Sequence, residues 1–152
     1  ILARRVRDAR QRRCVLMTPQ ECNPGRPHVF AFNAHGPRAP LHAGETGRGA
    51  GEGFNLNLPL ARGTPDAGYL EALAVALDRI RAFAPDMLVL AAGLDAAEDD
   101  PFRGFAVTPA GFEAIGRTIR GLDLPTLVVQ EGGYPSDNLG RNLAALLSGL
   151  GA

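Results

Sequence analysis

The feature that most constrains this sequence is a regular exchange between short apolar runs and longer segments with helical periodicity. Residues 87–92 (MLVLAA) form a continuous apolar run, which is typical of a strand buried on both faces of a parallel sheet. Residues 126–129 (TLVV) form a second buried run, and residues 29–32 (VFAF) a shorter one. Residues 54–58 (FNLNL) alternate apolar and polar side chains, as a strand with one buried face does. We predict a strand at each of these places.

The segments that separate or follow these runs predict helices. One helix begins after Thr108, a good amino-terminal cap followed by Pro109, and ends before Gly121. Residues 139–147 form a last amphipathic helix. The first helix covers residues 65–83, where apolar side chains recur at steps of three and four residues to form one stripe: Tyr69, Leu70, Leu73, Leu77 and Ile80. Strands and helices in alternation indicate an α/β fold with a parallel sheet.

Composition excludes several classes of protein. At 152 residues, with 45% apolar and 21% charged side chains, the chain is expected to form one globular domain. No apolar run approaches the roughly 18 residues that span a bilayer, and the amino terminus has no secretory pattern, so we expect a cytoplasmic protein with no membrane partner. Cys14 and Cys22 are too few for a disulfide framework, and we interpret them as reduced thiols.

The amino-terminal segment is unusual in its charge. Residues 1–50 carry nine Arg against Asp8, Glu21 and Glu45, and no Lys occurs anywhere in the chain. We expect residues 1–27 to be an aberrant, poorly structured segment with a short helix over residues 2–12, and residues 28–152 to form the domain. Basic clusters bind phosphates, but this one has no interleaved aromatic residues and no recognisable binding fold, so we expect no direct nucleic-acid partner.

Two segments carry residues that suit chemistry. In open parallel sheets, ligands bind outside the carboxyl ends of the strands. Asp95 comes just as the strand at residues 87–92 ends, and residues 130–134 (QEGGY) directly follow the strand at 126–129. Both loops should open on the same edge, which brings Asp95 and Tyr134 toward each other. A carboxylate there suits a divalent metal, and a phenol could donate to an oxyanion. From the residues alone, however, a lone Asp after a strand is more often a helix cap or turn former, and a lone Tyr more often packs.

Four segments carry motifs that are more specific than these single residues. They are GEGFNLNLPL at 51–60, GLD and DP within 93–101, GFAVTPAGF at 104–112, and LPTLVVQEGGY at 124–134. Together, in this order and spacing, they resemble the second half of the histone deacetylase and acetylpolyamine amidohydrolase family. The resembling stretch runs from about His28 to Leu150. The resemblance implies the carboxy-terminal half of a three-layer arginase/deacetylase-type fold with a mostly parallel sheet.

The resemblance also implies roles for individual residues. Asp95 matches the family's second zinc-ligating aspartate, and Tyr134 matches the tyrosine that stabilises the tetrahedral oxyanion. Gly132 and Gly133 match glycines that line the acyl tunnel. The implied reaction is zinc-dependent hydrolysis of an acetyl-lysine or acetylpolyamine amide.

The chain departs from the family pattern in several places. The family's Asp-x-His ligand motif and its His-His pair are missing, since the histidines are His28, His35 and His42, none adjacent to another. His35 resembles the family's strand-end histidine rather than a zinc ligand. Residues 37–44 (PRAPLHAG) lack the family's tunnel-wall aromatic residue. Asp99 replaces a usual glycine, a change that a surface turn could tolerate. We therefore expect a truncated member of the family that holds Zn²⁺ weakly or not at all and is inactive alone.

Other interpretations remain at this stage. The chain could be a non-catalytic, degenerate deacetylase-like module for binding or dimerisation, and a homo-oligomer is compatible with the sequence. One hypothesis for the missing motif and the excess of Arg is that residues 1–27 are translated out of frame from a GC-rich gene. The glycine loop at 47–53 leads into a strand rather than a helix, which argues against a nucleotide site.

Overall fold

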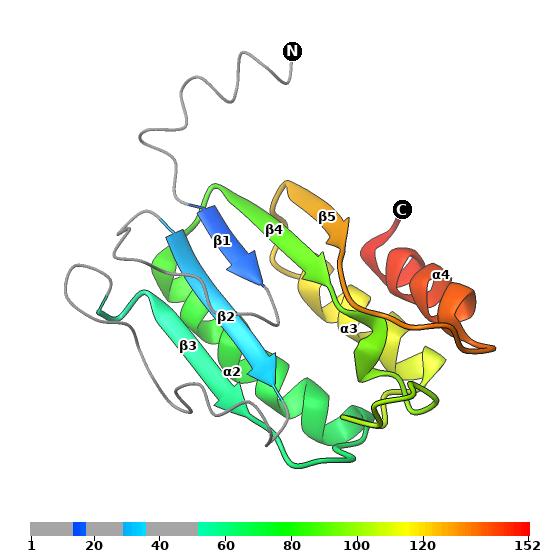
Figure 1. Ribbon diagram of the computed structural model, residues 1–152. Coiled ribbons are helices and arrows are strands. Elements are labelled where there is room, and N and C mark those ends of the chain that lie inside the picture. The colour runs from blue at the N-terminus through cyan, green and yellow to red at the C-terminus, as the bar shows by residue number, and fades with distance from the viewer. Residues whose placement is uncertain (1–13, 18–28, 36–51) are drawn as a thin grey trace.

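The computed structural model describes residues 52–152 in full and the backbone of two earlier strands, β1 and β2. The alternation of strands and helices predicted from the sequence is confirmed (Figure 1). The elements follow in the order β1 (Cys14–Met17), β2 (Val29–His35), β3 (Asn55–Pro59), α2 (Asp66–Phe83), β4 (Met87–Ala92), the 3-10 helix η2 (Leu94–Ala96), α3 (Pro109–Arg120), β5 (Thr126–Gln130) and α4 (Leu139–Leu150).

The strands form one five-stranded sheet in the order β3-β2-β1-β4-β5, and every pairing in it is parallel. β4 and β5 pair from Leu88 opposite Thr126 to Ala92 opposite Gln130, so the two strands end side by side. Because all strands run the same way, their carboxyl ends meet at one edge of the sheet (Figure 1). The expectation of a parallel α/β sheet is confirmed.

The strand β1 corrects the expectation that residues 1–27 lack regular structure. Cys14–Met17 pairs with β2 on one side and with β4 on the other, so it lies in the middle of the sheet. The run CVLM is apolar, as a central strand should be, but it is only four residues long and directly follows an arginine-rich stretch. The helix expected over residues 2–12 and Cys22 lie outside the described residues.

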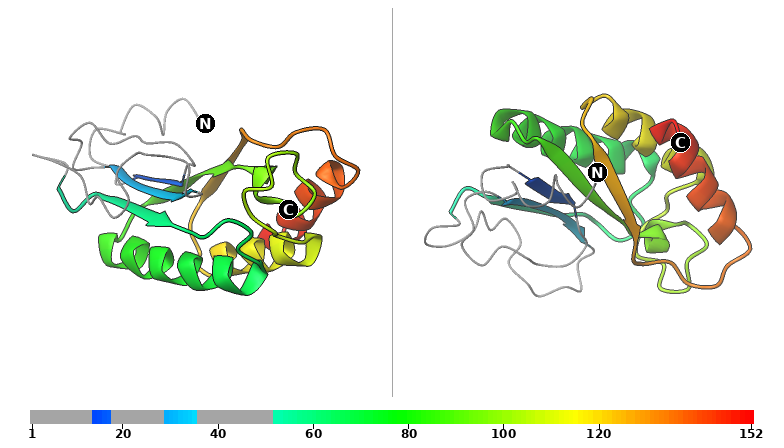
Figure 2. Two further views of the ribbon diagram at one scale, coloured as in Figure 1. Left: turned by 60° about the horizontal axis from the view of Figure 1, so that its bottom comes forward. Right: turned by 90° about the horizontal axis from the view of Figure 1, so that it is seen from above.

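The helices α2 and α3 lie on the same face of the sheet, and α4 packs along α3 (Figure 2). The stripe predicted for α2 is confirmed, because Leu73, Leu77 and Ile80 are almost fully buried. Burying a side chain of this size stabilises a fold by about 1.5–3 kcal/mol. The described residues thus build two layers, a sheet and a helical layer, with the core between them.

The start of α3 also follows its prediction. The Oγ1 atom of Thr108 accepts a hydrogen bond of 3.1 Å from the backbone N–H of Gly111, and Pro109 occupies the first turn. This cap satisfies one of the N–H groups that a helix leaves without a partner in its first turn.

Helices α3 and α4 cross at a pair of glycines. A Cβ atom on Gly116 would lie 2.4 Å from the carbonyl oxygen of Leu146, and one on Gly149 would lie 2.2 Å from that of Glu113. The two backbones therefore approach more closely than any side chain would permit.

The strand β5 was expected to be buried, and this expectation is wrong. Leu127 is 54% exposed and Val129 is 42% exposed, whereas Val128, which alternates with them, packs against the core. The reason is position, because β5 is the last strand in the order and the described helices cover only one of its faces. β4 is closer to its prediction, with Leu88 and Leu90 buried.

Among the helices that the structure describes, none has the length and apolar character that crossing a membrane requires.

Candidate functional site

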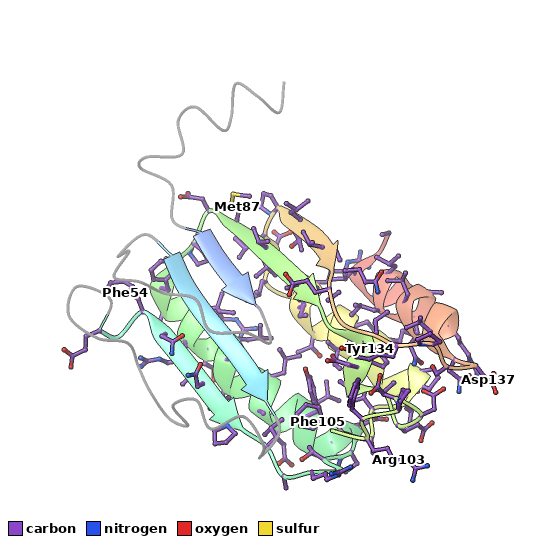
Figure 3. All side chains as sticks on the ribbon, in the orientation of Figure 1. Phe54, Met87, Arg103, Phe105, Tyr134 and Asp137 are labelled. Atoms are coloured by element: carbon purple, nitrogen blue, oxygen red, sulfur yellow. The ribbon has the colours of Figure 1, made fainter. Side chains whose placement is uncertain are left out.

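Two loops lie together at the carboxyl edge of the sheet. One follows β4 and spans residues 93–108, and the other follows β5 and spans residues 131–138. Because β4 and β5 are neighbours, the loops open on the same edge, as the sequence predicted (Figure 1). Figure 3 places Tyr134 beside the ends of these strands.

Asp95 lies in the short helix η2, just beyond the end of β4. The backbone N–H of Leu94 donates a 3.0 Å hydrogen bond to the carbonyl oxygen of Gly132, and that of Glu131 donates to Ala92 at 3.3 Å. These bonds continue the pairing of β4 and β5 past the ends of the strands. The segment that carries Asp95 is thereby attached to the segment that leads to Tyr134.

Local packing and backbone conformation explain why this second loop has glycine at positions 132 and 133. A Cβ atom on Gly132 would lie 2.7 Å from Oδ1 and 2.8 Å from Cγ of Asp95, so the backbone leaves room for the carboxylate. Gly133 has φ +122°, and a Cβ atom there would meet Leu94 and Leu139 at 2.9 Å. Both residues therefore fit the loop around Leu94 and Asp95, and their expected place in an acyl tunnel stays a prediction.

The carboxyl group of Asp95 is partly buried, and no cationic side chain among residues 52–152 pairs with it. Burial raises the pKa of Asp95, its own backbone hydrogen bond lowers it, and the negative charge of Asp100 raises it further. No ion pair within residues 52–152 involves Asp95. A cation placed here would relieve the cost of burying the ionised carboxylate.

The described residues do not complete a zinc site. They contain no group of three or more His, Cys, Asp or Glu side chains that could hold a metal ion. Catalytic zinc uses about three protein ligands and leaves a further position open. Asp95 fits one of these ligands, and any others must come from outside the described part of the chain.

Tyr134 lies at the rim of the site and is 44% exposed. It contacts Phe102 in a T-shaped arrangement, with ring centroids 4.7 Å apart and planes at 70°. Phe102 is itself 64% exposed, and the Nη2 atom of Arg62 donates to its carbonyl oxygen at 3.2 Å. The sequence analysis missed Phe102, since a lone Phe in a polar loop has no periodicity that places it beside Tyr134.

Tyr69 is a second residue that the sequence analysis did not assign to the site. It was placed on the apolar stripe of α2, where its ring indeed packs edge-on against Phe105 with centroids 5.7 Å apart. Burial raises the pKa of Tyr69 from 10.0 to about 12, and the negative charge of Asp95 adds to this rise. The first residue of the apolar stripe is thus a phenol whose pKa responds to the charge of Asp95.

Asp99, which replaces the family's usual glycine, makes a contact that the sequence did not predict. Its Oδ2 atom accepts a 3.3 Å hydrogen bond from the backbone N–H of Asn138, which caps α4. Its Oδ1 atom is buried and has no hydrogen-bond partner among the described residues. Asp99 therefore connects the loop after β4 to the start of α4.

Of the three histidines, the structure describes the backbone of His35. His35 is the last residue of β2, paired with Pro59 of β3, so its expected place at a strand end is confirmed. His28, His42 and the stretch at 37–44 lie outside the described residues.

Comparison with known proteins places these observations in a family. Residues 19–150 match the model of the histone deacetylase domain. An acetylpolyamine amidohydrolase of Burkholderia pseudomallei (strain 1710b) is 42% identical over 139 residues, which cover 88% of this chain and 41% of that protein. One from Mycoplana ramosa is 40% identical over 131 residues, covering 82% of this chain and 38% of that protein.

Solved structures agree with the sequence matches. The crystal structure of an acetylpolyamine aminohydrolase from Burkholderia pseudomallei aligns with a TM-score of 0.84 at 38% identity, covering 99% of this chain and 48% of that one. The crystal structure of the HDA15 HD domain aligns with a TM-score of 0.85 at 28% identity over the same shares. The chain thus spans less than half the length of these relatives. The family match begins at residue 19, before His28, where the resemblance was expected to start.

Proposed function

The chain belongs to the histone deacetylase family, and from this we propose that it supplies one side of a zinc-dependent site that hydrolyses an acetylated amine. The observation that supports the proposal best is the contact of the Asp95 carboxylate with the backbone of Gly132. This contact joins a metal-ligating type of side chain to the loop that carries Tyr134.

In this proposal Asp95 is a zinc ligand. A bound Zn²⁺ would supply Lewis-acid activation of water and of the amide carbonyl. The segment of Asp95 is held by backbone hydrogen bonds to the neighbouring loop, so the carboxylate is presented in a fixed place. Partial burial makes this carboxylate a better ligand than a freely solvated one, because less hydration is lost when a cation binds.

Tyr134 is the proposed oxyanion stabiliser. Its phenol donates a hydrogen bond to the oxygen that gains negative charge when the amide carbonyl is attacked. The exposed ring leaves the hydroxyl accessible to a substrate, and the edge-on contact with Phe102 restricts the directions the ring can take.

For the substrate we propose an acetylated polyamine ahead of acetyl-lysine. The relatives named as acetylpolyamine amidohydrolases match this chain at 38–42% identity over 70% or more of its length. Plant and fungal histone deacetylases match at 34–38% over 65–70%.

We further propose that the chain does not turn over substrate by itself. The sequence has no Asp-x-His motif and no adjacent histidines, and the described residues offer a single fitting carboxylate. The second candidate is a non-catalytic, deacetylase-like module for binding or dimerisation. Two observations favour it. A binding module needs no complete metal site, and the exposed apolar residues on the outer face of β5 could contact a partner.

A chimera tests the enzymatic proposal. Residues 52–152 replace the corresponding part of the Burkholderia pseudomallei acetylpolyamine amidohydrolase, which retains its own remaining residues. Hydrolysis of an acetylated polyamine and of a fluorogenic acetyl-lysine peptide is then measured, together with zinc content and circular dichroism. The variants are Asp95→Ala and Tyr134→Phe, and Asp78→Asn on the exposed face of α2 serves as the matched control.

We expect the chimera to bind zinc and hydrolyse the acetylpolyamine. Asp95→Ala should lose both, whereas Tyr134→Phe should keep zinc and lose about 100- to 1,000-fold in turnover, as expected for loss of one oxyanion donor. A folded chimera whose zinc content and turnover are unchanged by Asp95→Ala would contradict the proposal. A folded chimera that binds no zinc would favour the binding module.

A further inference from the structure

We propose that Asp66, the first residue of α2, is a positioning residue that fixes the loop carrying Asp95 through hydrogen bonds to Thr108. The inference rests on the proposed function in taking Asp95 as a site residue. The contacts themselves join Asp66 to Thr108 and do not involve the side chains of Asp95 or Tyr134.

Asp66 binds the start of the neighbouring helix with both carboxylate oxygens. Its Oδ1 atom accepts a 2.8 Å hydrogen bond from the backbone N–H of Thr108, and its Oδ2 atom accepts a 2.7 Å bond from the Thr108 hydroxyl. The Thr108 hydroxyl in turn accepts from the N–H of Gly111. A carboxylate with two such bonds fixes both position and orientation, because ionised acceptors bind more strongly than neutral ones.

The surrounding backbone is shaped to admit this carboxylate. A Cβ atom on Gly111 would lie 2.0 Å from Oδ1 and 2.4 Å from Cγ of Asp66. Gly111 has no positive φ that would require glycine. The position therefore excludes a side chain because the carboxylate fills the space.

From Thr108 the connection to Asp95 runs through short backbone ladders. The segment before α2 pairs with the segment before α3, where Ala106 donates to the carbonyl of Thr64 at 3.0 Å. That second segment then pairs with the end of η2, where Val107 donates to Ala96 and Glu98 donates to Val107, both at 3.0 Å. Asp95 directly precedes Ala96, so fixing Thr108 fixes its backbone.

A contact one turn further along α2 reinforces the arrangement. Tyr69 packs edge-on against Phe105, which lies three residues before Thr108 (Figure 3 labels Phe105). The first turn of α2 thus holds both ends of residues 105–108, one end by hydrogen bonds and the other by an aromatic contact.

The role is positional because the other side-chain and backbone anchors of the loop lie away from Thr108, at Asp99, Phe102 and Gly104. Residues 101–103 are exposed, and Phe102 is 64% exposed. Without the bonds of Asp66, residues 105–108 would keep the backbone ladders and the contact of Phe105 with Tyr69. The packing of α4 against α3 does not involve Asp66 and should remain. The predicted effect is a local loosening around Asp95 rather than a loss of the fold.

Amide hydrogen exchange of the full chain, followed by NMR, tests this. In Asp66→Asn and in Thr108→Val, the N–H groups of Ala106, Val107 and Glu98 should exchange faster by roughly tenfold to a hundredfold, the range that loss of a charged hydrogen bond permits. Amides in α4 should keep their rates. Leu94 precedes Asp95 in the chain, and the backbone of Gly132 lies against its carboxylate. The amide resonances of both residues should therefore shift in both variants.

Matched variants separate positioning from general destabilisation. Thr108→Ser keeps the hydroxyl and should restore the rates and resonances of the wild type. Asp78→Asn, on the same helix and paired with the exposed Arg81, should change neither. The proposal is overturned if exchange rises equally in α4 and in residues 96–107, or if the Leu94 and Gly132 resonances do not move. Because these readouts need neither zinc nor substrate, they stand even if the proposed activity fails.

Discussion

The backbone of Gly132 lies against the carboxylate of Asp95 so closely that a Cβ atom on Gly132 would stand 2.7 Å from Oδ1. Real Cβ atoms do not approach other heavy atoms this closely, so one of the two residues would have to move. The loop after β5 and the loop after β4 therefore depend on each other for their shape.

Replacing Gly132 by Ala should disturb Asp95 more than it disturbs the fold. We expect Gly132→Ala to lower the free energy of unfolding by about 1–3 kcal/mol, the usual cost of inserting atoms into a packed place. In the background of Asp95→Ala the same change should cost clearly less, because the carboxylate is gone. Urea unfolding of the four proteins of this double-mutant cycle measures the coupling. Equal costs in both backgrounds would show that Asp95 is not what excludes a side chain at Gly132.

The glycine crossing of α3 and α4 predicts a stability effect far from the site. Gly116→Ala and Gly149→Ala each place a Cβ atom against backbone of the other helix, and backbone cannot rotate away. Each should cost at least about 1–3 kcal/mol of unfolding free energy. Gly140, also in α4, has no atom within 4 Å of such a Cβ position, and Gly140→Ala should instead stabilise by roughly 0.5–1 kcal/mol. Guanidinium unfolding of the three variants checks the order, and similar costs for Gly140 and Gly149 would refute it.

The pKa of Tyr69 gives a prediction about alkaline pH. Burial, with a smaller contribution from the charge of Asp95, raises the pKa of Tyr69 to about 12 from 10.0. The folded state therefore keeps a proton that the unfolded state releases. The stability from the neutral phenol is fully present below pH 10.0 and is lost as the pH rises through about 12.

Tyrosinate absorbance measures this pKa directly. The chain has two tyrosines and no tryptophan, so Tyr134→Phe leaves Tyr69 as the only phenol. In that background Asp95→Asn should lower the pKa of Tyr69 without returning it to 10.0, because burial is the larger cause. Asp78→Asn should have no effect. A pKa that does not respond to Asp95→Asn would place Tyr69 beyond the reach of that carboxylate.

Much of this fold could be predicted from local sequence patterns. The apolar run of β4, the stripe of α2 and the Thr108 cap each depend on residues close together in the chain, so each appears in the sequence where it appears in the structure. The meeting of Asp95 with the Gly132 loop was predictable for a further reason, because parallel strands bring their following loops to one edge.

Other features could not be predicted, because they depend on partners distant in sequence. The apolar residues of β5 look buried by composition, but their exposure depends on the place of β5 in the strand order. The bonds between Asp66 and Thr108 and the contact between Phe102 and Tyr134 join residues more than 30 positions apart. The strand β1 was missed because four apolar residues after an arginine-rich stretch give too short a pattern.

The most direct test of the central claim is the zinc content of the purified chain, measured together with hydrolysis of an acetylpolyamine and of a fluorogenic acetyl-lysine substrate. If Asp95 is one ligand of an otherwise incomplete site, the chain should hold less than stoichiometric zinc, Asp95→Ala should remove what remains, and neither substrate should be hydrolysed. Stoichiometric zinc with hydrolysis that both Asp95→Ala and Tyr134→Phe abolish would contradict the claim that the site is incomplete. Zinc that persists in Asp95→Ala would contradict the assignment of Asp95 as its ligand.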